Sequence, residues 1–126
     1  MILNLTQHPA TPEQLTQGVV DLPADARAAL VRYLTVDTLP TEAEIDSRAR
    51  GIATLVYATG ADNAPTSVMV GGAPWMMRPL VTALHAEGVV QCLAAFSRRE
   101  SVEHTDPTTG AVTKTAVFRH AGFVPM

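Results

Sequence analysis

Three short apolar stretches alternate with longer segments of helical character, and this alternation constrains the fold more than any other feature. The apolar stretches lie at residues 1–7, 67–72 and 89–97. Runs of this length that are rich in β-compatible residues predict buried strands. Strands separated by helices are joined by right-handed crossovers, so we expect a mainly parallel sheet with helices on both faces.

The connecting segments carry helix signals and the last segment carries a hairpin signal. Thr11 followed by Gln14, and Thr41 followed by Glu44, match capping boxes. Helices are predicted at residues 11–18, 22–34, 39–60 and 73–89, with a loop at 61–66 and a kink expected at Pro79. Residues 101–120 have two β-rich arms around Pro-Thr-Thr-Gly, which predicts an antiparallel hairpin. The whole chain, 1–126, is expected to form a single α/β domain.

The composition narrows the classes of ligand and compartment. The chain has 126 residues, of which 47% are hydrophobic, and this is enough for one core. Its net charge of −3 disfavours a broad surface for duplex DNA or RNA, whereas a small anionic ligand needs only a local cluster of donors. Cys92 is the single cysteine, and there is no Cys/His ligand pattern and no membrane-length apolar run. We therefore expect a cytoplasmic protein without a metal, a cofactor or a membrane partner.

Polar residues or glycines follow each predicted strand. These residues are Thr6, Gln7 and His8 after the first strand, Gly71 and Gly72 after the second, and Ser97, Arg98 and Arg99 after the third. Ligands of parallel sheets bind beyond the carboxyl ends of the strands, so we expect the three groups to line one crevice. A glycine turn at a helix start lets N–H groups approach an anion, and guanidinium groups hold phosphates in bidentate fashion. The pattern favours a phosphate-bearing ligand.

Each of these features also has an ordinary structural explanation. The glycine pair lacks the spacing of a dinucleotide fingerprint, so a tight turn without a ligand explains it equally well. The arginines can belong to a solvated, salt-bridged loop, and His8 with Gln7 can simply cap a strand end. Trp75 is able to stack on a base, although such residues more often belong to the core or to an interface. Arg119 and His120, at the end of the last strand, are not assigned to either rim of the sheet.

Four segments together resemble small stand-alone CRISPR-associated and prophage proteins that are related to CARF-like domains. The segments are LNLTQHPATPEQ (3–14), VGGAPWMMRPLVTALHAEGV (70–89), AFSRRESVE (95–103) and DPTTGAVTKTAVFRHAGFV (106–124). The resemblance implies a compact, Rossmann-like fold of three layers and a two-fold homodimer. It also implies a small cyclic oligonucleotide as the ligand, because some relatives are ring nucleases that degrade cyclic oligoadenylate messengers.

The resemblance further implies a metal-independent reaction in which a ribose 2′-hydroxyl attacks the adjacent phosphate and leaves a 2′,3′-cyclic phosphate. The protein contributes positioning and charge stabilisation. The implied catalytic residues are Arg98 and Arg99, which would stabilise the phosphoryl charge, and His8, which would transfer protons. The implied ligand-binding residues are Thr6, Gln7, Gly71, Gly72, Trp75 and Ser97.

Two other functions fit the same sequence. A non-catalytic sensor or sponge needs the same phosphate donors without in-line geometry, and product formation distinguishes it from the enzyme. A phage-encoded protein-interaction module would depend on the apolar residues 75–77 instead of the arginines.

Overall fold

The computed structural model describes residues 1–60 and 67–126, and its described part forms one five-stranded sheet with four helices. In chain order the elements are β1 (Ile2–Leu5), α1 (Pro12–Thr16), β2 (Val19–Asp21), α2 (Ala24–Leu34), α3 (Glu42–Gly60), β3 (Ser67–Val70), α4 (Pro74–Ala86), β4 (Gln91–Thr105) and β5 (Val112–Pro125). The predicted loop at residues 61–66 lies outside the described residues. The mixed α/β class and the C-terminal antiparallel hairpin are confirmed.

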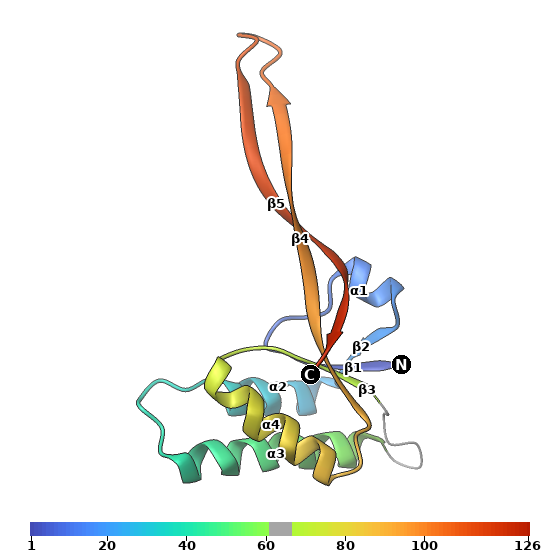
Figure 1. Ribbon diagram of the computed structural model, residues 1–126, viewed down its shortest axis with the longest axis vertical. Helices are drawn as coiled ribbons and strands as arrows, with labels where there is room; N and C mark the ends of the chain where they lie inside the picture. The colour runs from blue at the N-terminus through green and yellow to red at the C-terminus, as the bar shows by residue number, and fades with distance from the viewer. Residues whose placement is uncertain (61–66) are drawn as a thin grey trace.

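The sheet has the strand order β2-β1-β3-β4-β5, in which the first four strands are parallel and β5 is antiparallel to β4. Figure 1 shows α2, α3 and α4 together on one side of the sheet and α1 on the other. The chain first moves outward from β1 to β2 and then returns past β1 to β3. The loops after β1 and β3 therefore diverge, which makes this pair of strands a topological switch point.

The hydrophobic core lies between the sheet and the helices α2, α3 and α4. It combines alternate residues of the central strands with the inner faces of the helices, among them Leu5, Val68, Leu30, Ile52 and Leu80. Burial in the same core raises the pKa of the Cys92 thiol, which keeps the reactive thiolate scarce. The opposite face of the sheet is also covered, since Asn4, Met69 and Leu93 are buried there.

Capping residues fix the N-terminal starts of α1 and α3 close to the predicted positions. Thr11 and Gln14 form a reciprocal capping box, with N–H to oxygen distances between the two residues of 3.0 and 3.2 Å. The hydroxyl of Thr41 accepts the N–H of Glu44 at 3.2 Å. Arg48 of α3 donates to the carbonyl oxygens of Arg32 and Tyr33, both at 2.9 Å, and so satisfies the C-terminus of α2.

Of the helices in residues 1–60 and 67–126, none is both long and apolar enough to cross a membrane.

Two sequence-based interpretations of the strands are wrong. Residues 19–21 had no predicted structure, and they form the edge strand β2 beside β1. The predicted strand 89–97 and the first arm of the hairpin are one continuous strand, β4, of 15 residues. The ladder with β5 continues from Leu93 to Thr105 with one irregularity at Phe96/Ser97, and these hydrogen bonds carry the strand through its polar stretch.

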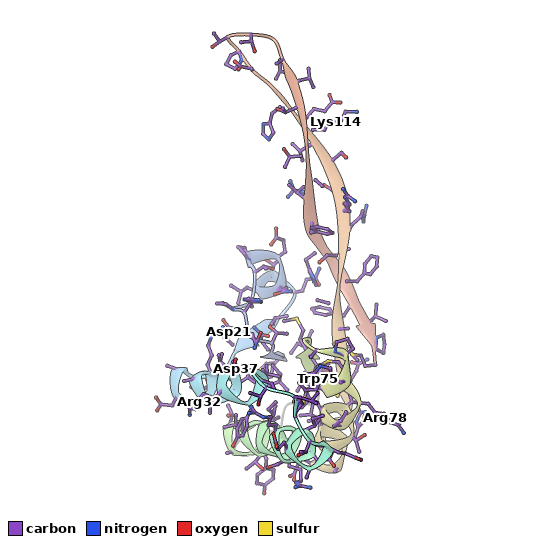
Figure 2. All side chains as sticks on the ribbon, turned by 90° about the vertical axis from the view of Figure 1, so that its left-hand side faces the viewer. Asp21, Arg32, Asp37, Trp75, Arg78 and Lys114 are labelled. Carbon is purple, nitrogen blue, oxygen red and sulfur yellow. The ribbon has the colours of Figure 1, made fainter. Side chains whose placement is uncertain are left out.

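The outer part of the β4–β5 hairpin, residues 97–120, projects from the rest of the molecule, and we call it the arm (Figure 1). None of its residues is buried. Lys114, far out along the arm in Figure 2, pairs with Glu103 at 3.7 Å, and nearer the base Arg119 pairs with Glu100 at 2.9 Å. The protein is therefore less compact than the sequence predicts.

Candidate functional site

A crevice of about 450 Å³ lies beyond the carboxyl ends of β1 and β3, at the switch point of the sheet. It is lined by the turn after β1, the start of α1, the glycine turn after β3 and the adjoining part of β4. Among the predicted site residues, the structure brings Thr6, Gln7, His8, Gly71 and Gly72 together here. We expected the ends of three predicted strands to line one crevice, and the structure brings two of them together.

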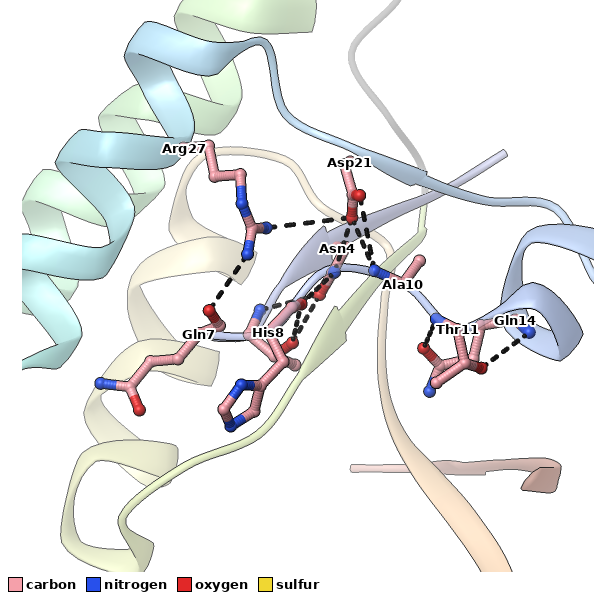
Figure 3. Close-up of polar contacts among 9 residues, drawn as sticks. Asn4, Gln7, His8, Ala10, Thr11, Gln14, Asp21 and Arg27 are labelled. Carbon is pink, nitrogen blue, oxygen red and sulfur yellow. Dashed lines mark hydrogen bonds and ion pairs between the residues drawn. The ribbon is translucent and has the colours of Figure 1, made fainter. Parts of the chain in front are cut away.

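The turn after β1 is held by Asn4, whose side chain is completely buried (Figure 3). Its Nδ2 donates to the carbonyl oxygen of His8 at 2.8 Å and to Asp21 at 2.8 Å. Its Oδ1 accepts the N–H of Thr6 at 2.9 Å and the Thr6 hydroxyl at 2.8 Å. A buried amide with this many partners fixes the backbone of residues 6–8 in one conformation.

A second set of contacts ties the same turn to β2 and α2. Asp21 accepts the N–H of Ala10 at 3.1 Å, and Arg27 of α2 donates from Nη2 to the carbonyl oxygen of Gln7 at 3.1 Å. The other guanidinium nitrogen of Arg27, Nη1, lies 4.0 Å from the Asp21 carboxylate and is buried. The turn is therefore anchored on both sides, and its exposed side chains project from a rigid base.

The opposite wall of the crevice is the glycine turn that leads into α4. A Cβ placed on Gly71 would lie 3.4 Å from Cγ2 of Thr6, so the two turns are in close contact. Gly72 has φ of +142°, a conformation that residues with a Cβ rarely adopt. The N-cap residue of α4, Ala73, has no side-chain hydrogen bond to the first turn. Pro74 has no N–H, and the N–H of Met76 donates to the carbonyl oxygen of Ala73 at 3.0 Å, so only part of the first turn of α4 is open to a ligand.

The crevice offers neutral donors and one imidazole. His8 is exposed, and Figure 3 shows its ring pointing away from the hydrogen bonds of Asn4. His8 is the only titratable side chain among the residues that line the crevice. Gln7 extends toward α2 and donates to the Thr35 hydroxyl at 3.4 Å, and the Thr6 hydroxyl is already used by Asn4. Proton transfer by His8 and anion contact by backbone N–H groups are the chemistry that this arrangement allows.

The predicted group Ser97, Arg98 and Arg99 is not at a strand end, because β4 continues through it. Alternate residues of a strand point to opposite faces, so the two arginines point away from each other. Ser97 and Arg99 share the face of Ala95, whereas Arg98, beside its cross-strand neighbour Arg119, shares the face of Ala94, and both alanines line the crevice. Each strand residue advances roughly 3.3 Å, so Arg99 lies about 13 Å along β4 from Ala95.

Trp75 does not line this crevice, although it follows the glycine turn. Its side chain is 45% exposed and lines a separate groove of about 720 Å³ between α3 and α4, together with Ile45 and Arg78. The groove contains the carboxylates of Glu42 and Asp46 and the guanidinium groups of Arg50 and Arg78, so its opposite charges balance. We regard the smaller crevice as the better candidate for a phosphate site because it lies at the carboxyl ends of the strands and contains no carboxylate.

The structure assigns Arg119 and His120, which the sequence left open, to the arm and its base. Nε2 of His120 lies 2.9 Å from Oε1 of Gln17, at the end of α1. The imidazole ring also packs edge-on against Phe123, with the ring centroids 4.9 Å apart. His120 thus fastens the base of the arm to α1 and has a structural role.

Sequence reasoning missed the residues that hold the turn after β1 in place, which are Asn4, Asp21 and Arg27. Asn4 had a usable signal, because it is the one polar residue inside the apolar run Ile-Leu-Asn-Leu. Asp21 and Arg27 had none, since their contact with the turn depends on β2 being recognised as a strand. In residues 1–60 and 67–126, no three His, Cys, Asp or Glu side chains form a group able to hold a metal ion.

The fold and the crevice define an α/β protein with a candidate ligand site at the carboxyl edge of a parallel sheet. The family described as "Uncharacterized protein MJ1673 family" has a model that matches residues 1–124, and the chain belongs to this family. No curated protein and no solved structure matches the chain. The geometry of the crevice is therefore the main basis for a functional proposal.

Proposed function

We propose that the crevice binds a cyclic oligoadenylate and that the protein cleaves it as a metal-independent ring nuclease. The observation that carries the proposal is the meeting of the Thr6–His8 turn and the Gly71–Gly72 turn at the switch point of the sheet. The strand order with helices on both faces is compatible with a Rossmann-like, CARF-like domain, which we propose as the finer fold assignment. The proposed function requires a cytoplasmic location.

The ligand is expected to be anionic because the crevice presents donors without opposing charge. No Asp or Glu is among its lining residues. The glycine turn supplies backbone N–H groups next to the positive end of the α4 helix dipole. A volume of about 450 Å³ lies in the usual range for small-molecule pockets, roughly 300–1,000 Å³. A ring of several nucleotides is larger than this, so it would extend beyond the crevice.

The proposed reaction is an internal transesterification. The ribose 2′-oxygen attacks the adjacent phosphorus and the bond from phosphorus to the 5′-oxygen breaks, which leaves a 2′,3′-cyclic phosphate and a free 5′-hydroxyl. The proton of the 2′-hydroxyl goes to His8, and the 5′-oxygen takes a proton from water, to which His8 then returns its own. The hydrogen bonds of Asn4 fix the backbone that carries the imidazole of His8, and the glycine N–H groups are proposed to stabilise charge on the phosphoryl oxygens. Arg98 and Arg99 are the proposed contacts for phosphates of the ring that lie beyond the crevice.

The test is incubation of the purified protein with cyclic tri-, tetra- and hexa-adenylate in EDTA, with products identified by mass spectrometry. Linear fragments with cyclic phosphate ends support the proposal. His8→Ala is expected to slow cleavage by about 10²- to 10⁴-fold while binding changes little. His104→Ala is the matched control, because His104 is an exposed histidine on the arm. Arg98→Ala and Arg99→Ala are each expected to weaken ring binding.

The same samples separate the proposal from its alternatives. A ring that is retained but not cleaved would indicate a sensor or sponge, because the donors are then present without in-line geometry. If no ring binds, the nucleotide proposal is wrong, and the α3–α4 groove becomes the place to look for a protein partner. Only Trp75 of the three predicted interaction residues is substantially exposed there, since Met76 is buried and Met77 packs against the core.

A further inference from the structure

The arm lacks the packing that normally stabilises a β-ribbon. A two-stranded ribbon is marginally stable in water unless a third strand or a helix covers it. Beyond the contact of His120 with Gln17, the arm extends away from the helices and the rest of the sheet (Figures 1 and 2). Phe118 is 73% exposed and Val112 is 57% exposed. A ribbon with this exposure would gain stability from a partner that covers it.

One face of the arm carries a pattern that is complementary to itself. Residues directly opposite each other in an antiparallel pair share a face, and this face consists of the pairs Arg99/Phe118, Ser101/Ala116 and Glu103/Lys114. The middle pair, Ser101/Ala116, has the smallest side chains. A cation and an aromatic ring lie on one side of it, and an anion and a cation lie on the other.

We propose that the partner is a second copy of this chain, whose arm packs antiparallel and face to face on the first, about a two-fold axis at Ser101 and Ala116. This symmetry sets Arg99 of each copy against Glu103 of the other. It also places the exposed ring of Phe118 beside the ammonium group and aliphatic stem of Lys114 from the other copy. The small residues on the axis allow the ribbons to approach closely. This pairing goes beyond the proposed catalytic function and does not depend on it.

The charge along the arm supports a second copy over a nucleic acid. The base carries three arginines and one glutamate, whereas the outer part carries Lys114 with Glu103 and Asp106. The base is therefore positive and the tip is negative. An antiparallel copy brings the tip of one arm to the base of the other, which matches opposite charges. A nucleic acid would bring phosphates against the acidic tip.

Sedimentation of the full chain and cross-linking of single cysteine variants test the arrangement. We expect a species of twice the monomer mass, and we expect Ser101→Cys to be joined to its symmetry mate by a short bifunctional maleimide. Val102→Cys is the matched control, because its side chain is adjacent but points to the other face of the ribbon. Cys92 is buried, so we expect it not to react with the maleimide. The unsubstituted protein, which has Cys92 alone, is the control for this expectation. A monomer, or cross-linking of Val102→Cys in place of Ser101→Cys, overturns the proposal.

A charge swap tests the contact between the copies. Arg99→Glu and Glu103→Arg are each expected to weaken dimerisation by about tenfold or more, because each sets like charges against each other. The double variant R99E/E103R is expected to restore the affinity to within about threefold of the unsubstituted protein. Arg98→Glu, on the opposite face, removes only long-range attraction to the acidic tip and is expected to weaken dimerisation by less than about threefold. Dimerisation that is insensitive to Arg99→Glu, or equally sensitive to Arg98→Glu, overturns the proposal. These readouts involve no nucleotide, so they are independent of the ring-nuclease test.

Discussion

The body and the arm of this protein are stabilised by different means. The body has a connected core in which residues such as Leu30 and Leu80 are completely buried. The arm has no buried residue and is held by a cross-strand ladder and two surface ion pairs. Burial of apolar area is the dominant stabilising term in folding, whereas exposed ion pairs contribute little. The fold can therefore tolerate change in the arm that it cannot tolerate in the body.

Truncation of a core residue should show the largest difference between the two regions. Leu30→Ala in α2 is expected to lower the free energy of unfolding by about 3 kcal/mol, because it leaves a cavity at a fully buried site. Phe118→Ala in the arm is expected to change it by about 0.5 kcal/mol or less at concentrations where the chain is monomeric. Urea denaturation followed by circular dichroism measures both. Equal losses for the two variants would contradict the division into body and arm.

Loss of a hydrogen-bonding side chain should show the next largest difference. Asn4→Ala is expected to cost about 2 kcal/mol, because the Thr6 N–H and the His8 carbonyl lose their buried partner. Thr113→Ala removes an exposed bond of 3.4 Å in the arm and is expected to cost no more than a few tenths of a kcal/mol. The same denaturation experiment applies. An Asn4→Ala variant as stable as the unsubstituted protein would show that the turn after β1 does not depend on this amide.

A substitution that disturbs the packing of α3 on α2 should change the free energy of unfolding by a smaller amount. A Cβ on Gly51 of α3 would lie only 2.5 Å from Cζ of Tyr33, so Gly51→Ala forces the ring to move. We expect a net loss of about 1 kcal/mol, since overpacking outweighs the gain in helix propensity. In a Tyr33→Ala background the same substitution should become stabilising, because only the propensity gain remains. A double-mutant cycle of thermal unfolding measures this coupling, and strict additivity would refute it.

Protonation of Asp106 in the turn at the tip of the arm should give the smallest change in stability, and this change depends on pH. The N–H groups of Thr108 and then Thr109 donate to Asp106 and hold the pKa of its carboxyl below the ordinary 3.8. A lowered pKa means that the ionised group stabilises the turn above pH 3.8 and that this contribution is lost as the pH falls below it. The amide shift of Thr108, followed by NMR, should report the change. Asp106→Asn should abolish the pH dependence, whereas a titration at the ordinary pKa would contradict the turn geometry.

Helix starts were more predictable from the sequence than strand limits. A helix start depends on neighbouring residues, so the capping box at Thr11 and Gln14 could be found by inspection. Strand limits depend on partners far along the chain. β2 has three residues and becomes a strand only because β1 lies beside it. The polar stretch at Ser97–Glu100 resembled a loop, and only the register with β5 shows that it is strand.

The residues of the candidate site were also predictable only in part. The rule that ligand sites follow strand ends brought Thr6, Gln7, His8, Gly71 and Gly72 together correctly. It misplaced the arginines because the third strand does not end where its apolar residues end. It misplaced Trp75 because a helix turns its successive residues to different sides, and here the indole faces α3.

The central position of β1 has a consequence for synthesis of the chain on the ribosome. β1 is the first of the described strands to be made, and Ile2 has Val19 as its neighbour on one side and Ser67 on the other. The first partner emerges soon after β1, but the second is made only after α2 and α3. During that interval the growing chain carries an apolar strand with one open edge, which is a template for aggregation. Between the emergence of residue 21 and that of residue 70, the nascent chain therefore depends on β2 alone to cover β1.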